Sequence, residues 1–159
     1  MADSGKIILI LVFVCGLLAG VVLIGLLSPQ QAHPGKQEIF SKNAPQPIGP
    51  YSQAVRSGDL VFMSGQIGID PVTGNLSSTV EGQTTRAMEN LNEILNESGL
   101  GFEDVVQARI YIVNMSDWTM VNRVYGSYFK DSHPARATVQ VAGLPKGADV
   151  EIEMVAQKR

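Results

Sequence analysis

Cysteine and histidine are nearly absent from this chain, which contains one Cys and two His among 159 residues. A single Cys excludes a disulfide within the chain. Zinc sites draw their ligands mainly from Cys and His, and this inventory hardly supplies such a set. We therefore expect no metal and no other cofactor, so that any chemistry depends on oxygen-bearing side chains, Arg and the backbone.

An excess of positive charge is also lacking. Lys and Arg number 12 against 15 Asp and Glu, the formal net charge is −3, and the basic residues form no run. Proteins that bind nucleic acid neutralise its phosphates with clustered Lys and Arg. The composition therefore predicts no nucleic-acid partner.

One long apolar run stands near the start of the chain. Residues 7–27 form 21 positions without a charged side chain, and as a helix they would span about 30 Å, the thickness of the hydrocarbon core of a bilayer. We expect a single transmembrane anchor here, after a short tail at residues 1–6. A cleaved signal peptide is the rival interpretation, although its apolar region is usually shorter. The short tail favours a single-pass membrane protein with an extracytoplasmic domain. The flanking Lys residues lie on both sides of the segment and barely decide its orientation, so a cytoplasmic domain is the alternative.

The remaining chain is predicted to be a linker followed by one globular domain. Residues 28–36 carry Pro29, Pro34 and Gly35, which resist helix formation. The domain then covers residues 37–159, a length that suits a single hydrophobic core.

Strand and helix patterns alternate along this domain. The predicted strands lie at 51–55, 59–65, 104–113, 135–142 and 149–157. Apolar residues at helical spacing predict one helix over 80–98, stopped by Gly99, and a second helix with Ser116 as its N-cap. This order predicts an α+β fold in which a mixed sheet is covered on one face by both helices. The other face then needs cover, which indicates a homo-oligomer.

Arg136 and Glu151 stand out because they place one Arg and one Glu on two strands rich in apolar residues. A guanidinium has no acid–base use near neutral pH, but its planar fork of donors suits two parallel hydrogen bonds to a carboxylate. These residues therefore predict a site for a small carboxylate. The bland alternative is a cross-strand ion pair between Arg136 and Glu151, which would contribute little if exposed.

Three segments together resemble the RidA (YjgF) family. They are Ile48-Gly49-Pro50-Tyr51-Ser52-Gln53-Ala54, Met63-Ser64-Gly65-Gln66, and the stretch from Pro134-Ala135-Arg136 through Leu144-Pro145 to Val150-Glu151-Ile152. The resemblance covers residues 39–159. It implies a chorismate-mutase-like fold and a homotrimer with three clefts between subunits. It also implies hydrolysis of small enamine and imine carboxylates, such as 2-aminoacrylate, to 2-oxo acids and ammonia.

The resemblance implies roles for six residues. Arg136 would clamp the carboxylate of the substrate, and Glu151 would hold and activate the water that attacks the C=N carbon. The residues that would line the cleft and bind the substrate are Tyr51, Ser64, Asn122 and Thr138. Many relatives have Cys where this chain has Thr138, a departure that puts thiol chemistry in doubt but leaves the imine mechanism whole. One well-oriented acid–base group suffices for an imine that is already electrophilic.

Two other classes of function compete with the enzyme. The chain could be a non-catalytic trimer that binds a small carboxylate or acts as a holdase, although the presence of both Arg136 and Glu151 counts against a loss of catalysis. Some relatives have been described as endoribonucleases, which usually need paired acid–base groups and a basic track. This acidic chain has neither, so the ribonuclease is the weaker alternative.

Overall fold

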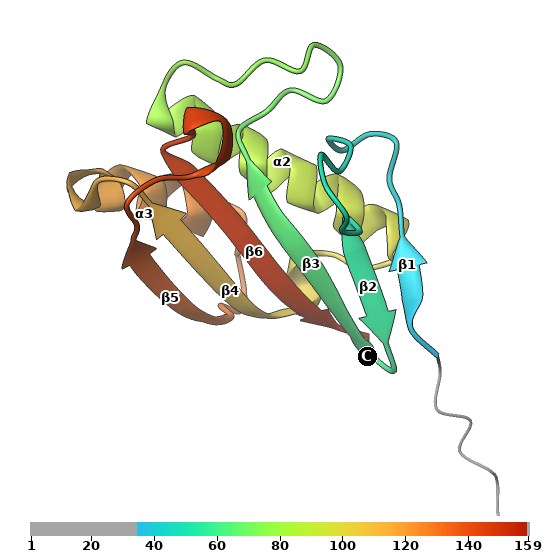
Figure 1. The fold of residues 1–159 in the computed structure, drawn as a ribbon. Helices are drawn as coiled ribbons and strands as arrows, with labels where there is room; N and C mark the ends of the chain where they lie inside the picture. Colours follow the sequence, from blue (N-terminus) through green and yellow to red (C-terminus); the bar gives the residue numbers. More distant parts are fainter. Residues whose placement is uncertain (1–34, 159) are drawn as a thin grey trace, which may run out of the picture. The chain divides into compact units, whose positions relative to one another are not determined.

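The computed structural model describes residues 35–158, which form a six-stranded sheet and two α-helices (Figure 1). The strands are β1 (Gln37–Ile39), β2 (Ala54–Ser57), β3 (Leu60–Ile67), β4 (Val105–Ile112), β5 (Ala135–Gln140) and β6 (Val150–Gln157). The helices are α2 (Val80–Glu97) and α3 (Trp118–Gly126), and short 3-10 turns occupy Phe102–Asp104, Met115–Asp117 and Pro145–Gly147. The expected α+β fold, a mixed sheet with two helices, is therefore confirmed.

The strand order is β1-β2-β3-β6-β4-β5, so the last strand of the chain lies inside the sheet. Neighbouring strands are antiparallel except β4 and β5, which are parallel. Parallel neighbours need a crossover connection, and α3 lies in the connection between these two strands. As a result, Arg136 lies on the edge strand β5, whereas Glu151 lies on the inner strand β6.

One face of the sheet packs against the helices to form the core. The buried residues of β6 are Val150, Ile152, Met154 and Ala156. They alternate with partly exposed residues, as expected for a strand with one covered face. The buried apolar residues of α2, which recur at helical spacing, are Ala87, Met88, Leu91, Ile94 and Leu95. In Figure 1, α2 lies behind the sheet, and we call the face turned toward the viewer the open face.

The structure differs from the sequence prediction at three short elements. The strand expected at 51–55 instead covers Ala54–Ser57. Ser116 does not cap a helix, because residues 115–117 form a 3-10 turn and the side chain of Asn114 accepts a hydrogen bond from the Ser116 backbone N–H. The helix α3 begins only at Trp118. Strand β1 has three residues, too few to show an alternating pattern, and it is defined by its pairing with β2.

The expectation of a single-pass membrane protein needs correction. No helix within residues 35–158 is long and apolar enough to cross a membrane. The longer of the two described helices, α2, is amphipathic and uses its apolar side to cover the sheet. The segment at 7–27, the tail at 1–6 and the linker up to residue 34 lie outside the described residues.

Candidate active site

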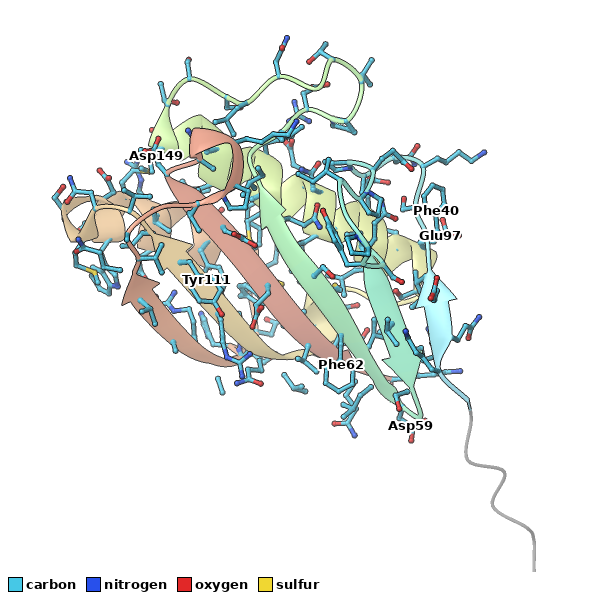
Figure 2. All side chains as sticks on the ribbon, viewed as in Figure 1. Phe40, Asp59, Phe62, Glu97, Tyr111 and Asp149 are labelled. Carbon is cyan, nitrogen blue, oxygen red and sulfur yellow. The ribbon has the colours of Figure 1, made fainter. Side chains whose placement is uncertain are left out.

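Five of the six residues expected at the site fall into two groups on opposite faces of the sheet, and Tyr51 lies in the loop before β2. Arg136 is paired with Ala108 of β4, which is buried under the helices. Glu151 is paired with Tyr111 of β4, and successive residues of a strand point to opposite faces. Figure 2 shows Tyr111 on the open face, so Glu151 belongs to that face and Arg136 to the helix side. A single copy of the chain therefore does not bring Arg136 and Glu151 together.

This arrangement also rules out the cross-strand ion pair. The strand β4 separates β5 from β6. Glu153, two residues after Glu151, instead forms an ion pair with Arg109 at 2.5 Å. Arg136 has its own partners on α3, described next.

The first group surrounds the guanidinium of Arg136. Its Nη2 donates a hydrogen bond to Oδ1 of Asn122 at 2.7 Å. Its Cζ lies 4.8 Å from the ring centroid of Tyr125, a cation–π contact. Asn122 and Tyr125 are three residues apart on α3, a spacing that places both on one side of a helix. These contacts engage one N–H and one face of the guanidinium, which leaves further donors for a ligand.

A small hollow adjoins Arg136. Its volume is about 320 Å³, and it is lined by Asn122, Tyr125, Gly126, His133, Pro134 and Arg136. Such a volume is at the lower end of the range of small-molecule sites. Thr138 lies two residues along β5 from Arg136, on the same face, and is partly buried. The structure thus brings Arg136, Asn122 and Thr138 to one side of the sheet.

The second group surrounds the carboxylate of Glu151. Within the sheet Glu151 lies between Ile67 of β3 and Tyr111 of β4. On β3, Ser64 and Gly65 together lie opposite the single residue Glu153, because the register shifts at this point as in a β-bulge. The bulge and the missing side chain of Gly65 make room for the Glu151 carboxylate.

The surroundings of Glu151 favour its protonated form. Burial raises the pKa of Glu151 above its ordinary value, and the negative charge of Glu153 raises it further. A carboxyl group with a raised pKa is better suited to accept a proton and to return it near neutral pH. This property is the one that the proposed water activation needs.

Ser64 adjoins the Glu151 group through the bulge on β3, and Tyr51 is linked to Ser64 only along the chain. Oγ of Ser64 donates a hydrogen bond to the backbone carbonyl of Ser52 at 2.7 Å, and Ser52 directly follows Tyr51. Tyr51 is 46% exposed, and its hydroxyl oxygen accepts a hydrogen bond from the backbone N–H of Ile48 at 3.3 Å. The Ser64 hydroxyl donates its single proton to the Ser52 carbonyl, so it can only accept a hydrogen bond from a ligand.

The open face near this group carries exposed apolar side chains. Phe62 and Val139 are each 46% exposed, and Val106 is 42% exposed. Figure 2 shows Phe62 on the same face as Tyr111. Exposed apolar residues that share a face indicate a surface that another molecule covers.

Two contributors to the site were not expected from the sequence as functional residues. Nothing in the sequence pattern indicated that the Glu151 side chain approaches Gly65. Tyr125 fits the apolar stripe of its helix, a pattern typical of core residues. Its spacing of three residues from Asn122 was the available signal, and that signal is weak without knowledge of where Arg136 lies.

Residues 41–158 match the model of the family described as Endoribonuclease L-PSP. The chain belongs to this family, the RidA/YjgF family. It is 44% identical over 122 residues to the human 2-iminobutanoate/2-iminopropanoate deaminase, a match that covers 76% of this chain and 89% of that protein. It is 39% identical over 152 residues to Reactive Intermediate Deaminase A, chloroplastic, from Arabidopsis thaliana, with 89% of this chain and 81% of that protein covered.

A solved RidA-family structure has the same fold. The crystal structure of Escherichia coli TdcF with bound serine matches with a TM-score of 0.75 and 36% identity, over 77% of this chain and 99% of that chain. The family and the RidA fold expected from the sequence are thus confirmed. The names of the human and Arabidopsis relatives support a RidA-family deaminase function.

Proposed function

We propose that this protein hydrolyses reactive enamine and imine carboxylates, of the 2-aminoacrylate and 2-iminopropanoate type, to 2-oxo acids and ammonia. The observation that carries the proposal is that one group offers an Arg for binding a carboxylate and the other offers a Glu for acid–base chemistry. One group presents an Arg whose fork is oriented by α3, and the other presents a Glu whose pKa is raised by burial. Two relatives named as deaminases of such intermediates support the same reaction.

The proposed site needs more than one copy of the chain. Arg136 and Glu151 lie on opposite faces of the sheet, so both can touch one small substrate only if a second copy supplies one of them. The exposed apolar residues Phe62, Val106 and Val139 would be covered in such an assembly. We propose a homotrimer with one cleft at each subunit boundary.

The reaction begins with binding of the carboxylate by the free donors of Arg136. An enamine substrate first gains a proton from solvent at its terminal carbon and becomes the protonated imine. The water oxygen then forms a bond to the C=N carbon while Glu151 takes one proton from that water, and the C=N electron pair moves to the nitrogen, which leaves a neutral carbinolamine. Glu151 returns the proton to the nitrogen, the C–N bond breaks with its electron pair on nitrogen, and the remaining hydroxyl proton passes through Glu151 to solvent as ammonia and the 2-oxo acid leave. No electrons are lost or gained by the substrate, so the step needs no redox partner.

The remaining four residues would position the substrate. Ser64 can accept a hydrogen bond from the N–H of the imine, because its own proton is held by Ser52. Tyr51 would close the same side of the cleft, and Asn122 and Thr138 would line the side that holds Arg136. None of these contacts requires a covalent bond to the protein.

Binding without catalysis is the second candidate. It is favoured by one observation, that the E. coli relative TdcF was solved with bound serine, a small molecule with a carboxylate. The Arg136 group alone would suffice for such binding, and Glu151 would then have no chemical task.

The test uses the purified full-length chain with a pyridoxal-phosphate dehydratase that releases 2-aminoacrylate from serine. Semicarbazide in the mixture traps the imine, and pyruvate formed in competition with the trap reports enzymatic hydrolysis. We expect the full-length chain to speed pyruvate formation, and Arg136→Ala and Glu151→Gln to abolish the effect. Arg123→Ala is the matched control, because Arg123 is an exposed Arg of α3 that pairs with Glu81 outside the hollow.

If the intact chain did not accelerate pyruvate formation, the proposed enzymatic activity would be overturned. Serine binding that is lost in Arg136→Ala but kept in Glu151→Gln would then support the binding protein. Degradation of RNA that survives both substitutions would indicate a different site or a contaminant.

A further inference from the structure

We infer that Tyr125 is a positioning residue, whose ring fixes the plane of the Arg136 guanidinium so that its free donors meet the substrate carboxylate in the same plane. The inference deepens the proposed function and rests on Arg136 as the carboxylate-binding group. Tyr125 would not touch the substrate. It would act through Arg136.

The geometry gives Arg136 two different restraints. Cζ of Arg136 lies over the Tyr125 ring, 4.8 Å from its centroid, and this contact holds the guanidinium against the ring face, which would restrain its plane. The Asn122 carbonyl oxygen, 2.7 Å from Nη2, fixes the rotation within that plane. An exposed Arg without such contacts has several rotatable bonds and loses entropy when it binds a ligand. Two restraints from neighbouring turns of α3 remove much of that cost before the substrate arrives.

Other aromatic side chains hold the Tyr125 ring in place. Tyr125 is only 3% exposed, and its ring centroid lies 4.8 Å from that of Phe129. Phe129 in turn contacts Phe102 edge to face, with 5.4 Å between the ring centroids. An aromatic ring packed in this way cannot follow the guanidinium, so the guanidinium must adapt to the ring.

The hydroxyl of Tyr125 has no part in this role. Within residues 35–158 it is buried and has no hydrogen-bond partner. Burial raises the pKa of Tyr125 to about 12, so the hydroxyl stays neutral at physiological pH. The aromatic face is therefore the part that acts on Arg136, and Phe should replace Tyr at this position without loss.

The kinetic test compares Tyr125→Phe and Tyr125→Leu in the full-length chain, with the dehydratase-coupled assay. Loss of the ring should raise KM about fivefold, as expected for one cation–π contact, while kcat changes by less than about twofold because the reacting groups are untouched. Tyr125→Phe should keep the wild-type KM. Tyr128→Leu is the matched control, because Tyr128 packs in the same aromatic cluster through Phe102 and is not a partner of Arg136.

A spectroscopic readout follows the contact without any assay of activity. In nitrogen-15 spectra of the full-length chain, the Arg136 Nε–H signal is identified by its loss in Arg136→Lys. A guanidinium stacked on a ring is shifted by the ring current. We expect Tyr125→Leu to remove this shift, and Tyr125→Phe and Tyr128→Leu to keep it.

The outcomes separate the two hypotheses. An inactive wild type with the ring-current shift present overturns the proposed function and leaves the contact supported. An active wild type with an unchanged KM and an unchanged signal in Tyr125→Leu overturns the positioning role alone. Tyr125→Leu is set aside if it loses cooperative thermal unfolding, and Tyr125→Phe then decides. A raised KM in Tyr125→Phe would assign the positioning of Arg136 to the hydroxyl and overturn the role of the ring.

Discussion

A Cβ atom at position 65 would lie 1.9 Å from Oε1 of Glu151, so the carboxylate occupies the space that any side chain at Gly65 would need. Both residues are on inner strands, β3 and β6, and Gly65 lies in the bulge of β3. The carboxylate can therefore keep its position only while residue 65 is glycine.

This contact predicts the effect of Gly65→Ala. The new methyl group should displace the Glu151 carboxylate and lower kcat at least tenfold, because misplacement of an acid–base group by about 1 Å costs far more in rate than in stability. The free energy of unfolding should change little, because the atoms in the way are the far end of the flexible Glu151 side chain. Steady-state kinetics and urea denaturation measure the two effects. Gly143→Ala is the control, since a Cβ there would meet no atom within 4 Å, and full activity of Gly65→Ala would contradict the placement of Glu151.

The raised pKa of Glu151 predicts a pH-dependent contribution to stability. The ordinary value is 4.5, and burial and Glu153 raise it in the folded protein. The folded state then binds the proton of Glu151 more tightly than the unfolded state, so stability is lost as pH rises through the folded pKa. Glu151→Gln, which stays neutral, should be more stable than the wild type at pH 7, and the difference should shrink as pH falls toward 4.5.

Urea denaturation of both proteins between pH 4.5 and pH 8 measures this difference. Glu38→Gln serves as the control, because the Glu38 side chain is 69% exposed on the short strand β1. A difference that does not vary with pH would count against a raised pKa of Glu151.

Gln83 of α2 binds Asp149, which directly precedes β6 and lies two residues before Glu151. Its Nε2 donates to Oδ2 of Asp149 at 2.9 Å, and its Oε1 accepts from the Asp149 backbone N–H at 2.8 Å. Gln83→Ala leaves both Asp149 groups without this partner in a partly buried place, and should lower the free energy of unfolding by about 1–3 kcal/mol. Gln83→Glu should be worse at pH 7, because it sets one carboxylate against another. Chemical denaturation measures both, with Asn96→Ala on the exposed side of α2 as the control.

Local patterns were sufficient to predict the main elements of this fold. The alternation along β6 and the apolar stripe of α2 depend only on neighbouring residues, and both are seen as expected. The cap at Ser116 was wrong because Asn114, two residues earlier, makes the competing turn. Gln53 shows another limit. It belongs to a segment that resembles the family, and it proves to be buried, with its amide bonded to the backbone of Ser41, Ala44 and Pro45.

The residue types at the site were predictable, but their placement was not. The sequence pattern places Arg136 and Glu151 on two strands rich in apolar residues, and either face of the sheet is compatible with that pattern. Their placement on opposite faces follows from the registers in which β5 and β6 pair with β4, and these registers are set by long-range contacts. The same holds for the cation–π contact of Arg136, which depends on how α3 crosses the sheet.

The separation of Arg136 and Glu151 predicts complementation between two inactive variants. If each site takes Arg136 from one copy and Glu151 from the next, an Arg136→Ala copy can supply the Glu and a Glu151→Gln copy can supply the Arg. Coexpression in equal amounts should then restore activity to about a quarter of the wild-type level, since random mixing in a closed ring makes one boundary in four fully intact. The two variants purified apart and mixed without subunit exchange provide the control. A double variant carrying both substitutions, coexpressed with the wild type, should likewise leave about a quarter of the boundaries intact. If coexpressed single variants stayed inactive while this second mixture kept half of the activity, the two groups would have to act within one copy, and the proposal of a shared site would fail.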